Sequence, residues 1–138
     1  YDRTIVLVSG DMLTLHVGTG EHVVRNQLRP YEPYAFPGEA EVFSKVAGPS
    51  VDFNVMVRRG VCDAEVEVQQ FLPGDGAVDV GPSSSGRLLL VVLDGVMEVA
   101  ENSSVAQLQP LDVAEVTSPV GLRSVRGAVV ALVRVTAR

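Results

Sequence analysis

An internal repeat restricts the fold of this chain more than any other feature of the sequence. In both copies a strand-like segment leads into a glycine turn and a methionine, a Leu-x-Pro-x-acid pattern follows, and a valine-rich segment comes last. The matching segments are 3–12 with 87–97, 28–32 with 108–112, and 51–58 with 128–135. Two copies of one β-unit, about 80 residues apart, predict a duplicated barrel. The alternative is that short valine-rich strands resemble one another by chance.

Composition and periodicity both favour an all-β fold. About a fifth of the residues are valine, and β-branched side chains suit a pleated sheet better than a helix. No segment shows a helical period over three turns, and Gly, Pro, Asp and Ser mark turns between short apolar segments, which is typical of a sandwich or barrel. The expected strands are 4–8, 13–17, 41–46, 51–58, 62–69, 88–93, 96–100, 113–116, 122–126 and 128–135.

The predicted fold is therefore an all-β, cupin-like barrel of the RmlC-like jelly-roll type with two repeated β-units, a bicupin. The first unit is expected at residues 1–72 and the second at residues 87–138. Residues 73–86, rich in Gly, Pro and Ser, form the expected linker. Because each unit is about half the size of a comfortable independent domain, the two are expected to share one core.

Charge and hydropathy argue against several classes of function. The chain has 11 basic and 17 acidic side chains, a net charge of −6, so it lacks the cationic surface that nucleic acids and anionic membranes require. Its longest apolar runs are far shorter than the ~20 residues that cross a bilayer. The single cysteine, Cys62, cannot form an internal disulfide, and no secretory signal is visible. We expect a cytoplasmic protein without nucleic-acid or membrane partners, and homodimer formation stays open.

Metal and nucleotide chemistry find little support in the sequence. A cupin metal site needs several histidines and a carboxylate, whereas this chain has only His16 and His22, at opposite ends of a tight hairpin. Cys62 alternates with apolar residues and has no neighbouring histidine. Nucleophile-elbow, P-loop and dinucleotide-binding patterns are all missing. No metal, no cofactor and no catalytic residue are predicted.

The segment 51–58 carries an unusual set of side chains on one face. Strand alternation places Asp52, Asn54, Met56 and Arg58 together, which combines an acid, an amide, a thioether and a guanidinium. This face suits a barrel interior that holds a small polar ligand. Arginine binds a carboxylate through two hydrogen bonds, asparagine offers a donor and an acceptor, and methionine packs on an apolar body. An ordinary edge strand of mixed polarity is the alternative.

Arg3 begins another expected strand, on the same side as Ile5 and Leu7. Those two apolar side chains should face inward. An inward arginine at the mouth of a barrel would bind an anion, whereas a frayed strand end would leave Arg3 in solvent. The residues alone leave both interpretations open.

Two longer strings resemble the HutD family, also called the Ves family. They are Arg-Pro-Tyr-Glu-Pro-Tyr-Ala-Phe-Pro-Gly at residues 29–38 and Asp-Phe-Asn-Val-Met-Val-Arg-Arg-Gly at residues 52–60. The resemblance implies a cupin-like fold with no bound metal, no established catalytic activity and an association with bacterial histidine utilisation. It also implies that Arg3 lies in a ligand pocket. Family members begin with a further segment that contains a tryptophan, so we expect residues upstream of Tyr1 that help to complete the pocket.

The sequence thus predicts a non-enzymatic binder of a small carboxylate, of the urocanate or N-formylglutamate type, that modulates histidine catabolism. The expected ligand-binding residues are Arg3, Asp52, Asn54, Met56 and Arg58. One alternative is a metal-free cupin isomerase or lyase that uses His16 or Asp52 as general base. Another is a regulatory module that binds a protein and whose barrel is filled by its own side chains.

Overall fold

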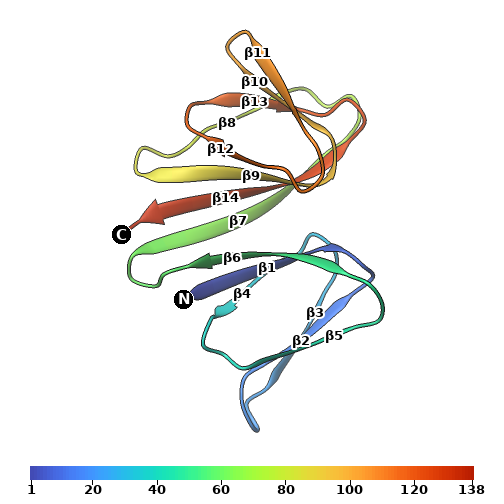
Figure 1. Cartoon of the computed structure of the whole chain (residues 1–138), viewed down its shortest axis with the longest axis vertical. Coiled ribbons are helices and arrows are strands. Elements are labelled where there is room, and N and C mark those ends of the chain that lie inside the picture. Colours follow the sequence, from blue (N-terminus) through green and yellow to red (C-terminus); the bar gives the residue numbers. More distant parts are fainter. The chain divides into compact units, whose positions relative to one another are not determined.

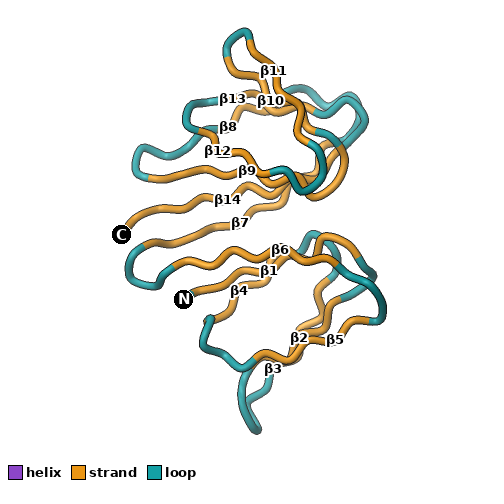
Figure 2. The backbone as a smooth tube through the Cα atoms, in the orientation of Figure 1, coloured by secondary structure: helices purple, strands orange, loops and turns teal.

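The computed structural model describes residues 1–138, which form strands and turns. The chain divides into two compact units, Tyr1–Val61 and Cys62–Arg138. Each unit consists of antiparallel sheets, coloured from blue to green for the first and from green to red for the second in Figure 1. Figure 2 shows that loops alone connect the strands. The all-β prediction is confirmed, and the structure contains no helix that could cross a membrane.

The first unit is built from two three-stranded sheets that pack through their apolar faces. The strand orders are β4-β1-β6 and β3-β2-β5. Side chains from both sheets meet in one core, which consists of Ile5, Leu7, Leu13, Leu15, Leu28 and Phe36. The strands are β1 (Asp2–Ser9), β2 (Leu13–Val17), β3 (Val24–Leu28), β4 (Pro33–Pro37), β5 (Val42–Val46) and β6 (Val51–Val57).

The second unit has two four-stranded sheets and a larger core. The strand orders are β12-β9-β14-β7 and β11-β10-β13-β8. Leucine and valine side chains from both sheets fill the space between them, with Leu88, Leu90, Leu122 and Leu132 fully buried. The strands are β7 (Cys62–Phe71), β8 (Val78–Val80), β9 (Gly86–Gly95), β10 (Met97–Glu101), β11 (Ser104–Leu108), β12 (Val113–Val116), β13 (Val120–Arg123) and β14 (Ala128–Ala137).

The two units repeat one pattern of strand pairing. In the first, β1 pairs with β4 and β6, and β2 pairs with β3 and β5; in the second, β9 pairs with β12 and β14, and β10 pairs with β11 and β13. The second unit adds β7 and β8 at its sheet edges. The repeat in the sequence is therefore a repeat in the fold.

The Leu-x-Pro-x-acid pattern forms the same turn in both units. In the second unit Leu111 has a φ of 69°, and its N–H donates to the carbonyl of Val92 at 2.7 Å. The Asp112 carboxylate accepts from the backbone N–H of Gln109 at 2.8 Å. In the first unit Tyr31 has a φ of 72°, and its N–H donates to the Leu7 carbonyl at 2.8 Å. The Glu32 carboxylate accepts from the backbone N–H of Arg29 at 3.1 Å. The positive-φ residue and the acid thus stabilise the turn at which the chain leaves one sheet for the other.

Every strand expected from the sequence overlaps an observed strand, but β3, β4, β8 and β11 were not expected. All of them lie at sheet edges. An edge strand pairs on one side only and needs fewer apolar residues, so its sequence signal is weak. Strand β4 even begins and ends on proline, which an edge tolerates.

The boundary between the units differs from the predicted one. Residues 62–69 were assigned to a first unit that ended at residue 72, but β7 pairs with β14 along its whole length, from Cys62 to Phe71. The first compact unit therefore ends at Val61. The expected linker, 73–86, contains β8, which extends a sheet of the second unit by pairing with β13.

Candidate functional site

A cavity of about 420 Å³ lies within the first unit, lined by side chains from both of its sheets. Its size falls in the range of sites for small molecules. Buried apolar side chains form the floor, and more exposed residues form the rim. The floor consists of Ile5, Leu13, Leu15 and Phe36, the rim of Val42, Ser44, Val46, Ser50 and Asp52, and Arg3 and Asn54 line the wall.

Neighbouring strands β1 and β6 bring the polar side chains of this cavity together. Their antiparallel register places Asn54 opposite Ile5 and Asp52 opposite Leu7, so both polar residues share the inner face of the sheet. Arg3 Nη2 donates to Asn54 Oδ1 at 2.9 Å, and Asn54 Nδ2 donates to Asp52 Oδ1 at 2.6 Å. A hydrogen-bond chain therefore runs from a guanidinium to a carboxylate.

Arg3 turns into the unit instead of extending into solvent. Its guanidinium carbon lies 5.0 Å from the centre of the Phe36 ring, a cation–π contact. Its Nε is buried and has no hydrogen-bond partner. A buried donor without a partner costs about 1–3 kcal/mol. An arginine held at this cost is well suited to binding an anion.

The repeat provides an internal comparison for these positions. The units align through Leu7 and Val92, which accept the same turn hydrogen bond. In the second unit the positions equivalent to Arg3, Asp52 and Asn54 are Leu88, Val130 and Leu132. Those three residues are at most 1% exposed and belong to the core. The fold itself needs only apolar packing here, so the polar set of the first unit calls for a functional explanation.

Two of the five expected site residues do not line the cavity. Met56 lies opposite Arg3 on β6, but its side chain is 61% exposed. Arg58 follows the end of β6 and is exposed. Strand alternation predicts which face a residue shares, but it does not predict how far along the strand a cavity extends.

The next arginine along the chain, Arg59, has a structural role. It forms ion pairs with Asp2 at 2.6 Å and with Glu39 at 2.7 Å. The hydrogen bond from Arg59 lowers the pKa of Glu39 to about 2, and the same contacts raise the pKa of Arg59. These contacts fasten the start of β1 to the loop after β4.

The cavity residues on β4 and β5 were not expected from the sequence. Phe36 lies on β4, which was not expected as a strand. On β5, Val42, Ser44 and Val46 alternate with Phe43 and Lys45, and this alternation was available from the sequence. The alternation predicts that Val42, Ser44 and Val46 lie on one face of the strand, but it does not predict which strands lie across the cavity from that face.

Neither histidine lines the cavity. His16 is next to Leu15 on β2 and therefore lies on the opposite face of the sheet, where its ring stacks on Phe43 with 6.3 Å between centroids. His22 is exposed in the loop before β3. The structure has no group of three or more His, Cys, Asp or Glu side chains that could hold a metal ion.

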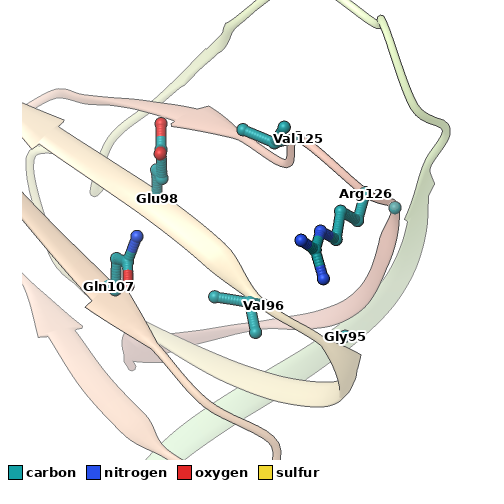
Figure 3. A pocket seen from close by; sticks show the side chains of 7 residues that line it. Gly95, Val96, Glu98, Gln107, Val125 and Arg126 are labelled. Atoms are coloured by element: carbon teal, nitrogen blue, oxygen red, sulfur yellow. The ribbon is translucent and has the colours of Figure 1, made fainter.

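The second unit has a cavity of about 390 Å³ of a different kind (Figure 3). Its walls are Val96 and Val125, both exposed, with Gln107 and Arg126 at its sides. Glu98 also lines it but forms an ion pair with Arg123 at 2.6 Å. No hydrogen-bond chain joins the polar groups of this surface pocket, so the cavity of the first unit is the stronger candidate.

Comparison with known sequences assigns most of the chain to one family. The HutD family model matches residues 1–131. Protein Ves from Cronobacter sakazakii is 31% identical over 100 residues, which cover 71% of this chain and 50% of that protein. The chain thus spans about half the length of this curated relative.

Solved structures share the fold at low sequence identity. A conserved protein of unknown function from Pseudomonas aeruginosa PAO1 has a TM-score of 0.82 and 20% identity, over 99% of this chain and 72% of that one. HutD from Pseudomonas fluorescens SBW25 has a TM-score of 0.76 and 21% identity, over 99% of this chain and 68% of that one. The predicted cupin-like β fold is confirmed, and with the family model matching nearly its whole length, the chain belongs to the HutD family.

Proposed function

We propose that this protein binds a small carboxylate, of the urocanate or N-formylglutamate type, and thereby modulates histidine catabolism without catalysing a step itself. The observation that carries the proposal is the hydrogen-bond chain through Arg3, Asn54 and Asp52. This chain lines a cavity at positions that are apolar in the repeated unit. Membership of the HutD family adds support.

Arg3 is the proposed partner of the ligand carboxylate. A guanidinium has five N–H donors, and Arg3 uses Nη2 for its bond to Asn54. Donors that remain can form two parallel bonds to a carboxylate, a geometry that supplies both affinity and orientation. The apolar floor beneath, which includes Ile5 and Leu15, would contact the body of the ligand.

Two rival functions find less support in this geometry. An isomerase or lyase needs a general base within reach of its substrate. His16 lies on the other face of β2 and does not line the cavity, and Asp52 lies at the exposed rim. A purely protein-binding module would have a barrel filled by its own side chains. The cavity of about 420 Å³ favours a small-molecule binder.

Calorimetric titration of the full-length protein with urocanate and with N-formyl-L-glutamate tests the proposal. We expect at least one of them to bind. Loss of the charged partner in Arg3→Ala should weaken that binding by about 2–5 kcal/mol. Arg58→Ala is the matched control, because Arg58 lies outside the cavity, and it should change affinity little. The proposal is wrong if neither compound binds, or if Arg3→Ala binds as well as the wild type.

A further inference from the structure

The cavity of the first unit contains a cationic and an anionic side chain that are held apart. Arg3 and Asp52 both line it, yet they form no direct ion pair. The amide of Asn54 lies between them, accepts from Arg3 at 2.9 Å and donates to Asp52 at 2.6 Å. Asn54 thus connects the two charged groups without letting them neutralise each other through direct contact.

This arrangement differs from the other charged contacts of the protein. Elsewhere arginine and acid meet directly, with nitrogen-to-oxygen distances between 2.6 and 3.7 Å. These pairs are Arg59 with Asp2 and Glu39, Arg87 with Glu115, Arg123 with Glu98, Arg134 with Glu67, and Arg138 with Asp63. In a direct pair each charged group is the partner of the other. In the cavity, by contrast, the second carboxylate oxygen of Asp52 has no partner.

The two charged groups also differ in depth. Arg3 is half-buried against Phe36, while Asp52 is exposed at the rim. A ligand whose carboxylate reaches Arg3 must therefore direct its other end toward the rim and Asp52. A cationic or N–H group at that end can donate to the unpaired oxygen, but a second carboxylate there meets a like charge.

We propose that Asp52 is a specificity-determining residue of this site, which selects monocarboxylates with a cationic or N–H-donating group at the far end and disfavours dicarboxylates. The inference rests on the proposed function and chooses between its two ligand types. It favours an imidazole-bearing acrylate over an acylated glutamate. At the exposed rim, where water weakens charge interactions, we expect a discrimination of about fivefold or more.

The test compares three compounds by calorimetry on the full-length protein at low salt. Urocanate carries one carboxylate and an imidazole, trans-cinnamate has the same acrylate with a phenyl ring and no N–H, and N-formyl-L-glutamate carries two carboxylates. The wild type should bind urocanate most tightly and N-formyl-L-glutamate least tightly. Added salt should reduce the difference between these two, because it screens the charge of Asp52.

Asp52→Asn is the decisive variant, because its amide oxygen can still accept from Asn54 while the charge is removed. It should lower the ratio of urocanate to N-formyl-L-glutamate affinity about fivefold or more. Asp11→Asn removes an exposed acid outside the cavity and should leave the ratio unchanged. A ratio that Asp52→Asn does not change, or a wild type that prefers the dicarboxylate, overturns this inference alone if Arg3→Ala still weakens binding. If no compound binds the wild type, the proposed function falls and this inference falls with it.

Discussion

Residues at equivalent positions of the two units have different surroundings: some pack in an apolar core, and others line the cavity. Leu132 and Asn54 occupy equivalent places in the two units, one in a packed core and one at a polar wall. A half-buried guanidinium and amide contribute less to stability than apolar side chains of similar size would. The first unit therefore accepts weaker packing at Arg3 and Asn54, which is common where a protein binds a ligand.

Exchanging the residue types at these equivalent positions should have opposite effects. Leu132→Asn places an amide among apolar side chains and should destabilise the protein by about 2–5 kcal/mol. Asn54→Leu should change the free energy of unfolding by no more than about 1 kcal/mol while it abolishes ligand binding. Urea denaturation and calorimetry of both variants measure the two effects. Equal losses of stability would contradict the assignment of Asn54 to the site.

The pKa of Glu39 makes stability depend on pH. The hydrogen bond from Arg59 lowers this pKa from 4.5 to about 2 in the folded protein. Because the folded value lies below the unfolded one, the ionised carboxylate stabilises the fold above about pH 4.5, and this contribution disappears as the pH falls toward about 2.

Glu39→Gln should therefore lower the melting temperature at neutral pH, and its difference from the wild type should vanish near pH 2. Differential scanning calorimetry across this range measures the difference. Glu41→Gln, which changes an exposed acid nearby, serves as control and should show no such trend. A difference for Glu39→Gln that stays constant with pH would rule out this contribution.

At the scale of elements, the repeated turn is the feature that joins sequence pattern to topology. Leu111 and Tyr31 adopt a positive φ, a conformation that costs a residue with a Cβ atom about 1–3 kcal/mol. The acid that follows each of them holds the turn through a hydrogen bond to the backbone. The pattern thus ends one strand and begins the next on the opposite sheet in both units.

Removing that acid should weaken the second unit by a measurable amount. Asp112→Ala deletes the acceptor of the Gln109 backbone N–H, which lies 2.8 Å away, and should cost about 1 kcal/mol. Gln109→Ala keeps this bond, since only the backbone of Gln109 takes part, and should be nearly neutral. Chemical denaturation of both variants provides the comparison. Similar losses would show that the carboxylate is not what holds the turn.

For the whole molecule, the two units combine one topology with different interiors. The first core has six buried residues and the second has twelve, and the polar cavity is in the first. Local unfolding is easier where fewer apolar contacts are buried. The first unit should therefore be the less protected part of the chain and the part that a ligand stabilises.

Hydrogen exchange measured by mass spectrometry tests this difference. Amides of β9 and β14 should exchange more slowly than amides of β1 and β2. Urocanate at about 100 times its dissociation constant should add about 2.7 kcal/mol to the stability of the bound state and slow exchange in β1 and β6. Protection that increases only in β9 and β14 would place the ligand elsewhere.

Features that depend on local periodicity and turn chemistry were predictable from the sequence. Valine-rich alternation predicted the all-β class and the shared face of Asp52 and Asn54, because side chains in a strand alternate whatever the strand pairs with. The Leu-x-Pro-x-acid pattern predicted the repeat, because a turn is specified by a few adjacent residues.

Features that depend on pairing between distant segments became evident only in the folded protein. The fold placed Phe36 and Ser44 in the same cavity as Arg3, left Met56 and Arg58 outside that cavity, and assigned β7 to the second unit. Register and strand order are fixed by contacts between residues far apart in the chain, which no local pattern encodes. The sequence therefore predicted the face of the site, and the pairing of distant strands determined its extent.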